Sequence, residues 1–526
     1  MADAASDRSG TDPLGLSGHT VVVAGAGTAG LSAARYLLTR DVRVVLADDR
    51  FASKEADDAT RRAAFDAVNG AGELVARGVR AVAIADLLAD PEWSSDVAVV
   101  IVSPGFAPTH ELVVRAERDG IPIWGEVELA WRVDAAGLLG EPRTWLVVTG
   151  TNGKTTTTSM LAEIVERSGR SGAACGNIGL PVLDAMRATP RVDVLCAELS
   201  SFQLHWAPSV TPAAGVVLNI ADDHLDWHGG FDAYAEAKTG ALRGGIGVVG
   251  LDDAVASGLS AAGRRVGFTL HAPEDGQLGV SDGHLVDRAF GAGRLIEAEA
   301  IRPAGPSGIA DALAASALAL AIGVERDAVE AALRDFRPGA HRGEMVAERD
   351  GIVFVDDSKA TNPHAAQAAV SAFGRVVLIA GGLLKGASMD EMLTAVGDRL
   401  AGVVAIGRDR DLVVEAISRH APEVPTVTVF TGDDGTVNVH RPGHADPVPF
   451  PIESSDFESS GTDTAVAVME QAVSEAWELA AASDPAPDAV LLAPAAASLD
   501  MFAGYSRRGD AFADAARRVA GAASRR

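Results

Sequence analysis

Short apolar runs alternate with helix-forming segments along almost the whole chain, and this alternation constrains the fold more than any other feature. Thr20–Ala24 is the first run, and apolar residues from Leu31 to Leu38 then recur at helical spacing. Similar runs follow at Val42–Ala47, Val97–Val102, Trp145–Thr149, Val192–Ala197, Gly215–Leu218, Ile352–Val355, Val376–Ala380, Val403–Ile406, Thr426–Phe430 and Ala489–Ala493. Short apolar strands separated by helices predict an α/β protein whose parallel sheets are covered on both faces.

Length and turn-forming stretches divide the chain. At roughly 100–200 residues per domain, 526 residues suggest about three domains. Stretches with glycine and proline at Ala135–Pro142 and Arg337–Gly343 each precede a new apolar run, so we place the boundaries there. We predict domains at residues 1–140, 141–338 and 339–526, a disordered tail at residues 1–17 and a mobile surface insertion at residues 431–462.

The overall charge excludes some partners. The net charge is −27, so nucleic acid or an anionic membrane would be repelled. The first residues lack the basic and apolar regions of a signal peptide, and no run of about 18 apolar residues could span a membrane. The only two cysteines, Cys175 and Cys196, suit a reducing compartment. We therefore expect a cytoplasmic protein that acts on small molecules, and we expect it to be a monomer.

The sharpest local signal is Gly150-Thr151-Asn152-Gly153-Lys154-Thr155-Thr156, which follows an apolar run and opens a helical segment. Glycines let backbone N–H groups converge on an anion, and a helix N-terminus favours negative charge. Lys154 can reach terminal phosphates, and the Thr155 hydroxyl can bind Mg²⁺. Only two residues separate Gly150 from Gly153, fewer than in the usual phosphate loop. The pattern favours a phosphate-binding loop over a plain glycine turn.

A second glycine-rich turn, Gly25–Gly30, matches G-x-G-x-x-G between a strand and a helix. Asp48 ends the next strand, about where a ribose-binding acid would lie. From the motif alone, NAD(P), another nucleotide diphosphate and a purely structural turn all remain open.

Polar residues also follow other strands, at the carboxyl ends where α/β sites form. Glu198 and His224 could complete Mg²⁺ coordination, although Mg²⁺ prefers oxygen ligands and the residue pattern favours a surface-loop histidine at position 224. By composition, Lys238 is an exposed helical lysine. Three further polar or glycine-rich segments indicate ligand contact in the last third of the chain: Asp356–Pro363, Gly381–Gly386 and Pro494–Ser498.

Together these segments resemble the Mur ligase family. The matching motifs are Thr149–Thr156, Gly176–Gly179, Glu198–Leu204, Asn219–His224, His341-Arg342, Asp357–Asn362, Ser498–Phe502 and Arg508–Phe512, in the family's order. The Asp-Ser-Lys-Ala-Thr-Asn run and the C-terminal motifs look like the branch that adds D-glutamate to UDP-N-acetylmuramoyl-L-alanine.

The resemblance implies three domains: a Rossmann-like N-terminal domain that holds the UDP substrate, a central P-loop domain with a parallel-core sheet that binds ATP, and a Rossmann-like C-terminal domain that receives D-glutamate. The resemblance therefore favours a UDP site over an NAD site at Gly25–Gly30. The implied UDP-substrate residues are Thr28, Asp49, Arg50, Ser103, Pro104, Gly105 and Asn177.

The resemblance also implies a mechanism, in which ATP phosphorylates a substrate carboxylate and the amine of D-glutamate then displaces phosphate. The cofactors would be ATP and Mg²⁺. The implied catalytic residues are Lys154, Glu198, His224, Lys238 and Lys359, and the metal-binding residues are Thr155, Glu198, His224 and Lys238, the last carbamylated. ATP would contact Gly150, Thr151, Asn152, Gly153, Lys154, Thr155, Thr156, Arg342 and Asp357, and D-glutamate would contact Thr361, Lys385, Ser498 and Phe502.

The sequence departs from the family at the adenine site, where Ser307–Asp311 replaces the usual histidine and asparagines. Other readings are a related amide ligase, such as another muramoyl ligase or a folylpolyglutamate synthase, a nicotinamide-dependent oxidoreductase, and a non-catalytic nucleotide-binding regulator. The Asp357–Asn362 run and the C-terminal motifs argue against the related ligases.

Overall fold

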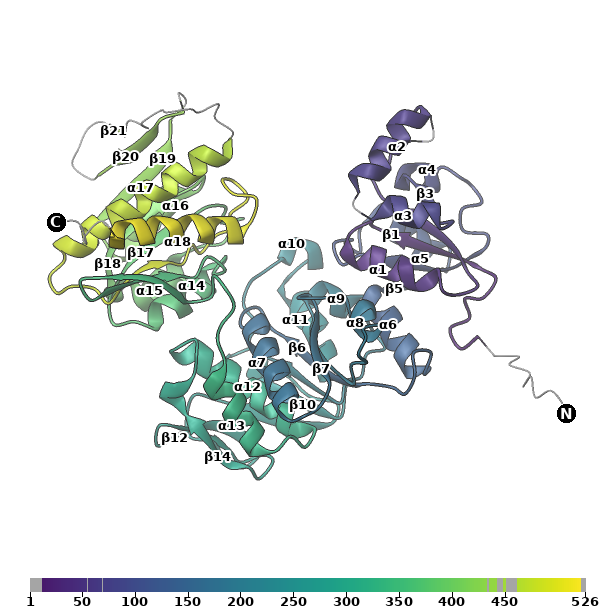
Figure 1. Cartoon of the computed structure of the whole chain (residues 1–526), viewed down its shortest axis with the longest axis horizontal. Coiled ribbons are helices and arrows are strands. Elements are labelled where there is room, and N and C mark those ends of the chain that lie inside the picture. The colour runs from purple at the N-terminus through teal and green to yellow at the C-terminus, as the bar shows by residue number, and fades with distance from the viewer. Residues whose placement is uncertain are drawn as a thin grey trace. The chain divides into compact units, whose positions relative to one another are not determined.

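Three mostly parallel sheets, one after another along the chain, form the protein (Figure 1). The structure is a computed structural model that describes residues 12–53, 55–68, 70–432, 435–441, 448–450 and 461–521. The chain forms two compact units, one of Met1–Ile296 with Asp311–Leu333 and the other of Glu297–Ala310 with Arg334–Arg526. The α/β fold class predicted from the alternation is therefore confirmed.

The first sheet has five parallel strands in the order β3-β2-β1-β4-β5, which is a Rossmann-like arrangement. Val21 and Val23 of β1 face one apolar cluster, and Val22 and Ala24 face another, so helices cover both faces. The elements are β1 Thr20–Ala24, α1 Thr28–Leu37, β2 Arg43–Ala47, α2 Asp58–Ala67, α3 Ala71–Ala76, β3 Arg80–Val82, α4 Ile84–Leu88, β4 Val97–Val102, α5 Glu111–Arg118, β5 Ile123–Gly125 and α6 Glu126–Ala135.

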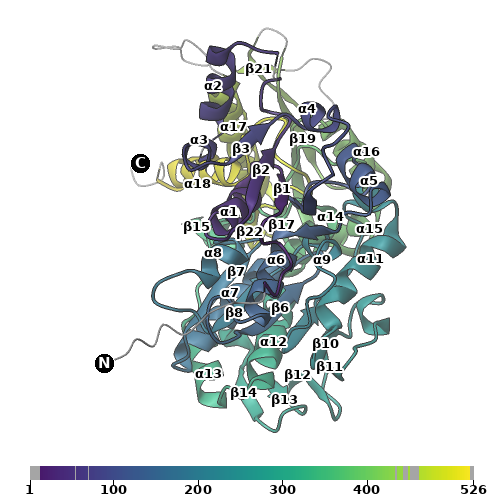
Figure 2. The same cartoon turned by 90° about the vertical axis from the view of Figure 1, so that its right-hand side faces the viewer.

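The second sheet has nine strands in the order β14-β13-β12-β11-β10-β9-β6-β8-β7, parallel from β7 to β12. Helix α7 packs across β6, β7 and β8 (Figure 2). The strands are β6 Thr144–Thr149, β7 Gly172–Gly176, β8 Val194–Glu198, β9 Ala214–Val217, β10 Ile246–Gly250, β11 Arg264–Phe268, β12 Gln277–Ser281, β13 His284–Asp287 and β14 Gly293–Glu297. The α-helices are α7 Lys154–Arg167, α8 Val182–Met186, α9 Ser201–His205, α10 Leu225–His228, α11 Phe231–Thr239, α12 Pro306–Ala321 and α13 Arg326–Asp335.

The third sheet has eight strands in the order β15-β16-β22-β17-β18-β19-β20-β21, parallel from β16 to β19. Helices α17 and α18 lie along one face, and α14, α15 and α16 cover the other (Figure 1). The elements are β15 Glu344–Arg349, β16 Ile352–Asp356, α14 Pro363–Ser371, β17 Val376–Gly381, α15 Asp390–Val396, β18 Leu400–Ile406, α16 Arg410–His420, β19 Thr426–Thr431, β20 Val437–His440, β21 Val448–Phe450, α17 Gly461–Ala482, β22 Ala489–Leu492 and α18 Tyr505–Gly521.

Two sequence predictions about irregular segments need correction. The predicted tail ends too late, because Asp12 accepts backbone N–H bonds from Leu14 and Ser17 and because Leu16 is buried in the core. The predicted insertion contains strands β20 and β21, which extend the third sheet. Residues 1–11, 433–434, 442–447 and 451–460 lie outside the described part of the chain. The predicted boundaries near residues 140 and 338 fall between sheets and remain predictions.

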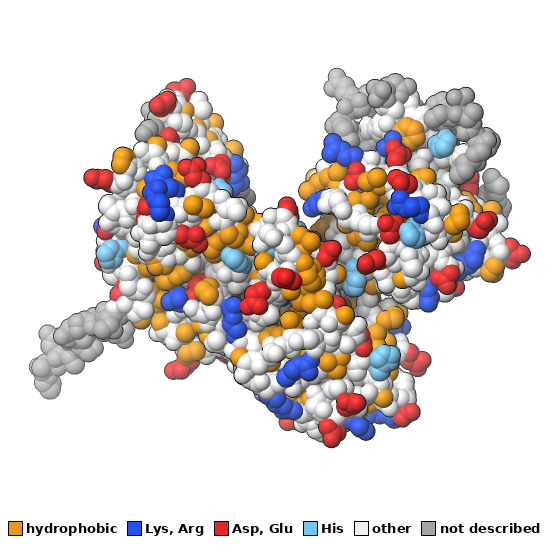
Figure 3. Space-filling model, turned by 180° about the vertical axis from the view of Figure 1, so that it is seen from behind, with side chains coloured by type: hydrophobic (Ala, Val, Ile, Leu, Met, Phe, Trp, Pro, Cys, Tyr) orange, Lys and Arg blue, Asp and Glu red, His pale blue; other side chains and the backbone are white. Residues whose placement is uncertain are grey.

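Among the residues that the structure describes, no helix is both long enough and apolar enough to cross a membrane. Over the face shown in Figure 3, acidic and basic side chains are interspersed with uncharged surface. Both cysteines are buried and unpaired, and burial raises their pKa values, so they behave as core residues.

Candidate active site

The predicted phosphate loop lies between the end of β6 and the start of α7. Gly153, at the N-cap of α7, has a φ of +82°, which side chains rarely adopt. A Cβ atom at this position would also lie 2.3 Å from Asp311 Oδ1. The loop therefore requires glycine at position 153, and it presents the amino end of a 14-residue helix, where backbone N–H groups can receive a phosphate.

Asn219, which follows β9, holds the phosphate loop in shape. Its Oδ1 accepts a hydrogen bond from the Asn152 N–H at 2.8 Å, and its Nδ2 donates to the Asn152 carbonyl at 3.2 Å. The Asn219 carbonyl also accepts from the Thr151 N–H at 3.0 Å. Because these bonds fix the loop backbone before any ligand binds, little reorganisation is needed to receive phosphates.

Two predicted catalytic lysines converge on one carbonyl oxygen of this loop. Lys154 Nζ donates to the carbonyls of Gly150 and Thr151, both at 2.9 Å, and Lys238 Nζ donates to the Gly150 carbonyl at 2.8 Å. The structure thus places these two predicted residues together at the phosphate loop.

Lys238 is 1% exposed, so the composition-based interpretation of an exposed helical lysine is wrong. Its ammonium lies over the Tyr234 ring, 4.6 Å from the centroid, and Tyr234 in turn hydrogen-bonds to Thr151 Oγ1. Burial, and after it the charge of Lys154, holds the pKa of Lys238 well below its ordinary value. The sequence pattern alone gave no signal of this burial, because a lysine in a helix that also carries Asp232 and Glu236 is typical of an exposed position.

Glu198 is the last residue of β8. It lies beside β6, the strand that leads into the phosphate loop, because Val148 of β6 pairs with Glu198 in parallel register. The side chain is 1% exposed. Its Oε1 accepts from Asn177 Nδ2 at 2.7 Å, whereas its buried Oε2 has no hydrogen-bond donor among the described residues. A buried carboxylate oxygen without a donor is costly unless a cation or another donor meets it, so the arrangement suits a divalent cation.

His224 lies on the loop after β9 with a φ of +53°. Its Nε2 is 3.5 Å from Asp223 Oδ1, and its ring centroid is 4.8 Å from that of Phe202. The side chain is about half exposed, and these contacts do not join it to Glu198 or Thr155. The surface-loop description favoured by the residue pattern fits what the structure shows, and a metal-binding role for His224 stays a prediction.

The Gly25–Gly30 turn and the Ser103–Gly105 loop lie side by side at the carboxyl end of the first sheet. Ser103 Oγ donates to the Gly25 carbonyl at 3.2 Å, and a Cβ at Gly25 would lie 2.5 Å from that hydroxyl. Thr28, Asp49 and Gly105 are exposed around this turn.

Asp48 has both carboxylate oxygens engaged. One accepts from the Ala26 N–H at 2.6 Å, and Arg50 donates to both oxygens at 2.8 Å. Burial raises the pKa of Asp48, but the Arg50 and backbone hydrogen bonds bring it below its ordinary value. Asp48 therefore supports the turn and orients Arg50, and it is not free to receive a ribose hydroxyl.

In the third sheet, β22 lies between β16 and β17, so the loops after these three strands adjoin. The Ala495 N–H donates to the Ala360 carbonyl at 3.0 Å, and Leu383 and Ala497 exchange two hydrogen bonds of 2.9 Å. These bonds bring together the loops that carry the predicted D-glutamate residues Thr361, Lys385 and Ser498.

Beside these loops, the Lys359 ammonium lies over the Tyr505 ring, 4.0 Å from its centroid. Burial raises the pKa of Asp357 to about 7, while the charge of Arg342 acts to lower it.

Phe502, predicted to hold D-glutamate, is only 6% exposed and belongs to the core on the α17 and α18 face. Tyr505, three residues on, is the aromatic side chain available at this edge.

Arg508 joins two of these loops from within the core. Its guanidinium donates to Ser358 Oγ and to the Ser358 carbonyl, at 3.0 and 2.8 Å, and to the Ala496 carbonyl at 3.0 Å. The side chain is 1% exposed, and burial lowers its pKa to about 10. A bidentate fork in this position fixes the spacing of the loops after β16 and β22.

In the stretch that departs from the family at the adenine site, Asp311 Oδ1 accepts a hydrogen bond from Thr157 Oγ1 at 3.0 Å. Asp311 therefore braces the helix that follows the phosphate loop. We assign no adenine contact to Ser307–Asp311.

Comparisons with known proteins agree over nearly the full length. Family models described as "Mur ligase MurD-like, N-terminal domain", "Mur ligase middle domain" and "Mur ligase, glutamate ligase domain" match residues 19–125, 148–271 and 341–440. A relative from Rhodococcus jostii (strain RHA1), named UDP-N-acetylmuramoylalanine–D-glutamate ligase, is 52% identical over 96% of both chains. A relative of the same name from Mycolicibacterium smegmatis (strain ATCC 700084 / mc(2)155) is 50% identical over 99% of this chain and 100% of its own.

Among solved structures, the UDP-N-acetylmuramoylalanyl-D-glutamyl-2,6-diaminopimelate–D-alanyl-D-alanyl ligase from Acinetobacter baumannii matches with a TM-score of 0.51 and 15% identity. The match covers 94% of this chain and 93% of that one. At this identity the likeness concerns the three-domain fold alone.

Proposed function

The chain belongs to the Mur ligase family, and we propose that it is the ATP-dependent ligase that adds D-glutamate to UDP-N-acetylmuramoyl-L-alanine in peptidoglycan precursor synthesis. The observation that carries the proposal is the 52% identity, over 96% of both chains, to the Rhodococcus ligase of that name. The phosphate loop, folded between β6 and α7 with Lys154 at its mouth, supplies the matching chemistry.

The reaction needs a leaving group, because a carboxylate is a poor electrophile. A carboxylate oxygen of the UDP substrate attacks the γ-phosphorus of ATP, and the bond from phosphorus to the ADP oxygen breaks. The amine of D-glutamate then attacks the acyl carbon, loses a proton and expels phosphate. Lys154 and the N–H groups at the start of α7 stabilise the charge on the transferring phosphoryl group.

We assign Mg²⁺ to Thr155, Glu198, His224 and a carbamylated Lys238. Two members of the set fit, because Glu198 Oε2 is buried without a donor among the described residues and because Lys238 is buried beside the loop with a lowered pKa. The contacts of His224 described above do not join it to them. When bound, Mg²⁺ neutralises phosphate charge. Asn177 holds the other Glu198 oxygen and so aims the carboxylate.

Replacing Glu198 with glutamine tests this assignment. The amide keeps the size of the side chain but loses its charge, so we expect the Mg²⁺ concentration for half-maximal activity to rise about tenfold or more. The matched control is Glu163→Gln, which removes an exposed carboxylate from α7 and should leave the Mg²⁺ dependence unchanged. Equal Mg²⁺ dependence in the two variants would remove Glu198 from the metal site.

The two substrates occupy different parts of the chain in this proposal. The UDP substrate binds at Thr28, Asp49, Arg50, the Ser103–Gly105 loop and Asn177. D-Glutamate binds at Thr361, Lys385 and Ser498, where a cation and a hydroxyl can receive its carboxylates, with Tyr505 in the place first given to Phe502. Arg342, Asp357 and Lys359 serve the nucleotide.

We further propose three domains divided near residues 140 and 338, a monomeric enzyme and a cytoplasmic location, where ATP and UDP-linked precursors are found.

Phosphate release with ATP, Mg²⁺ and UDP-N-acetylmuramoyl-L-alanine tests the function. It should require D-glutamate and fail with L-glutamate or D-alanine. Release with another amino acid would assign the chain to a different branch, and no release with any would refute the ligase.

A further inference from the structure

Two tryptophans of the central sheet region donate hydrogen bonds to neighbouring carbonyls of a first-sheet loop. Trp206, which follows α9, donates from Nε1 to the Phe106 carbonyl at 3.1 Å. Trp227, in α10, donates from Nε1 to the Gly105 carbonyl at 3.2 Å. Both carbonyls belong to the segment Ser103–Phe106, which contains the Ser103–Gly105 loop that we assign to the UDP substrate.

Aromatic contacts hold the two indoles in place. Phe202 packs against Trp227 with ring centroids 4.5 Å apart, and the same Phe202 ring lies 4.8 Å from His224. His205 meets Trp206 edge-on at 4.5 Å and Trp227 at 5.3 Å. The ring cluster that orients the indoles is therefore the one that contacts the predicted catalytic histidine.

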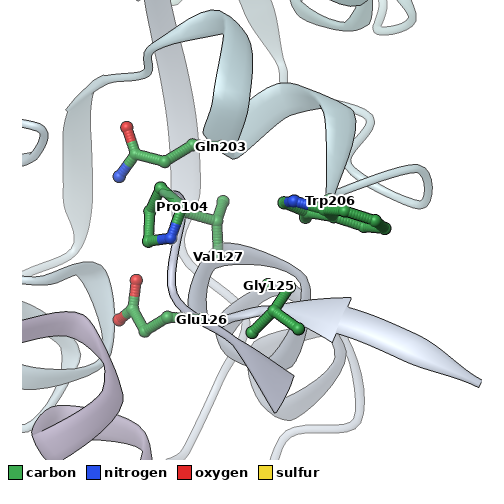
Figure 4. Close-up of a pocket in the computed structure, with 7 residues that line it drawn as sticks. Pro104, Gly125, Glu126, Val127, Gln203 and Trp206 are labelled. Carbon is green, nitrogen blue, oxygen red and sulfur yellow. The ribbon is translucent and has the colours of Figure 1, made fainter. Parts of the chain in front are cut away.

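The backbone under Trp206 is fixed as well. The Gly125 N–H donates to the Trp206 carbonyl at 2.7 Å, and a Cβ at Gly125 would lie 3.0 Å from Trp206 Cβ. Glu128 Oε2 accepts from the Ser209 N–H at 2.9 Å in the same region. Trp206 lines a small pocket with Pro104, Gly125 and Gln203, as Figure 4 shows. These contacts restrict movement of the indoles relative to the Ser103–Phe106 segment.

We propose that Trp206 and Trp227 act as positioning residues, an indole clamp that holds the Ser103–Phe106 loop against the His224-bearing segment and so places the UDP substrate for phosphoryl transfer. The clamp rests on the proposed function for its substrate. Its geometry lies within one compact unit of the chain.

The competing explanation is plain packing, in which the indoles only fill space. Phenylalanine separates the two explanations, because Trp→Phe keeps an aromatic ring and removes the N–H donor. Trp93→Phe is the matched control: Trp93 is buried in the first domain, and its Nε1 has no hydrogen-bond partner among the described residues. Replacing it loses ring volume but no hydrogen bond.

The first test needs no substrate. Hydrogen–deuterium exchange of the free protein should show faster exchange at residues 103–108 in Trp206→Phe and Trp227→Phe, and fastest exchange in the double variant. Trp93→Phe should leave the exchange of these residues unchanged. Unchanged exchange at 103–108 in the double variant would overturn the clamp, whether or not the protein proves to be this ligase.

The second test concerns positioning. Each clamp variant should raise KM for UDP-N-acetylmuramoyl-L-alanine about 2- to 10-fold, the scale of one lost hydrogen bond, while KM for ATP and for D-glutamate stay within twofold. Equal changes in all three KM values, or the same change in Trp93→Phe, would contradict positioning. A wild-type protein without ligase turnover would refute the proposed function alone, because the exchange result stands apart from it.

Discussion

Replacing Lys154 with alanine should lower kcat about 10³-fold or more, with the fold intact. Its ammonium donates hydrogen bonds to the Gly150 and Thr151 carbonyls of the phosphate loop, both at 2.9 Å. Charge stabilisation of a transferring phosphoryl group is worth factors of about 10³–10⁵ when one cation supplies it. The side chain is partly exposed, so water can replace its hydrogen bonds and stability should change little.

Phosphate release measures this effect, and thermal unfolding checks the fold. Arg167→Ala is the control, since it removes a cation from the last turn of the same helix and should keep normal turnover. An active Lys154→Ala protein would exclude the phosphate-loop assignment. Loss of activity together with a large drop in unfolding temperature would show a structural role in place of a catalytic one.

Replacing Lys238 with alanine should lower activity about 100-fold, and short carboxylates such as formate or acetate should restore part of it. Burial and the neighbouring Lys154 hold the pKa of Lys238 below its ordinary value, so more of the amine is neutral at a given pH. A neutral amine can attack the carbon of CO₂ and lose a proton, which forms a carbamate. The added carboxylate would take the place of this anion.

Carbon-13 NMR of the wild-type protein under labelled CO₂ should show a carbamate signal that Lys238→Ala lacks. Glu236→Ala, an exposed change on the same helix, should keep both the signal and the activity. Full activity in Lys238→Ala would remove the lysine from the mechanism. Lost activity without rescue and without a wild-type carbamate signal would leave the lysine as a buried amine that only braces the Gly150 carbonyl.

The apolar runs predicted the central strands of the first and third sheets, but in the second sheet they predicted β6, β8 and β9 and missed β10 to β14. The run at Thr20–Ala24 and the run at Val97–Val102 match β1 and β4 residue for residue. Strand β7, Gly172–Gly176, escaped prediction because glycine and alanine carry no β-forming signal. Parallel pairing with β8 makes this segment a strand. Strands β20 and β21 escaped because polar and proline-containing edge strands resemble loops.

The candidate site was predictable where one segment contains the whole motif, as at Gly150–Thr156. It was not where distant segments meet. No local sequence pattern encodes the contacts between such segments. Examples are the hydrogen bonds that join Asn219 to the phosphate loop, Arg508 to Ser358 and Trp227 to Gly105. Phe502 and Tyr505 lie three residues apart in sequence, and only packing shows which ring is buried.

A second sequence signal, the scarcity of lysine, coincides with the predicted site. The chain has 45 lysines and arginines together, and only five of them are lysines: Lys54, Lys154, Lys238, Lys359 and Lys385. The last four are all predicted site residues. Arginine can replace lysine at most surface positions, but it cannot supply a neutral amine or a compact ammonium. The scarcity of lysine is therefore a second sequence signal that favours a chemical role at these four positions.

Oxygen-18 labelling tests directly whether ATP activates the substrate carboxylate. UDP-N-acetylmuramoyl-L-alanine with both carboxylate oxygens labelled with oxygen-18 would be incubated with the protein, ATP, Mg²⁺ and D-glutamate, and the released phosphate analysed by mass spectrometry. We expect one labelled oxygen in each phosphate, because the carboxylate oxygen that attacks ATP leaves with the phosphoryl group. Product formation with unlabelled phosphate would contradict activation of the carboxylate by ATP at this site.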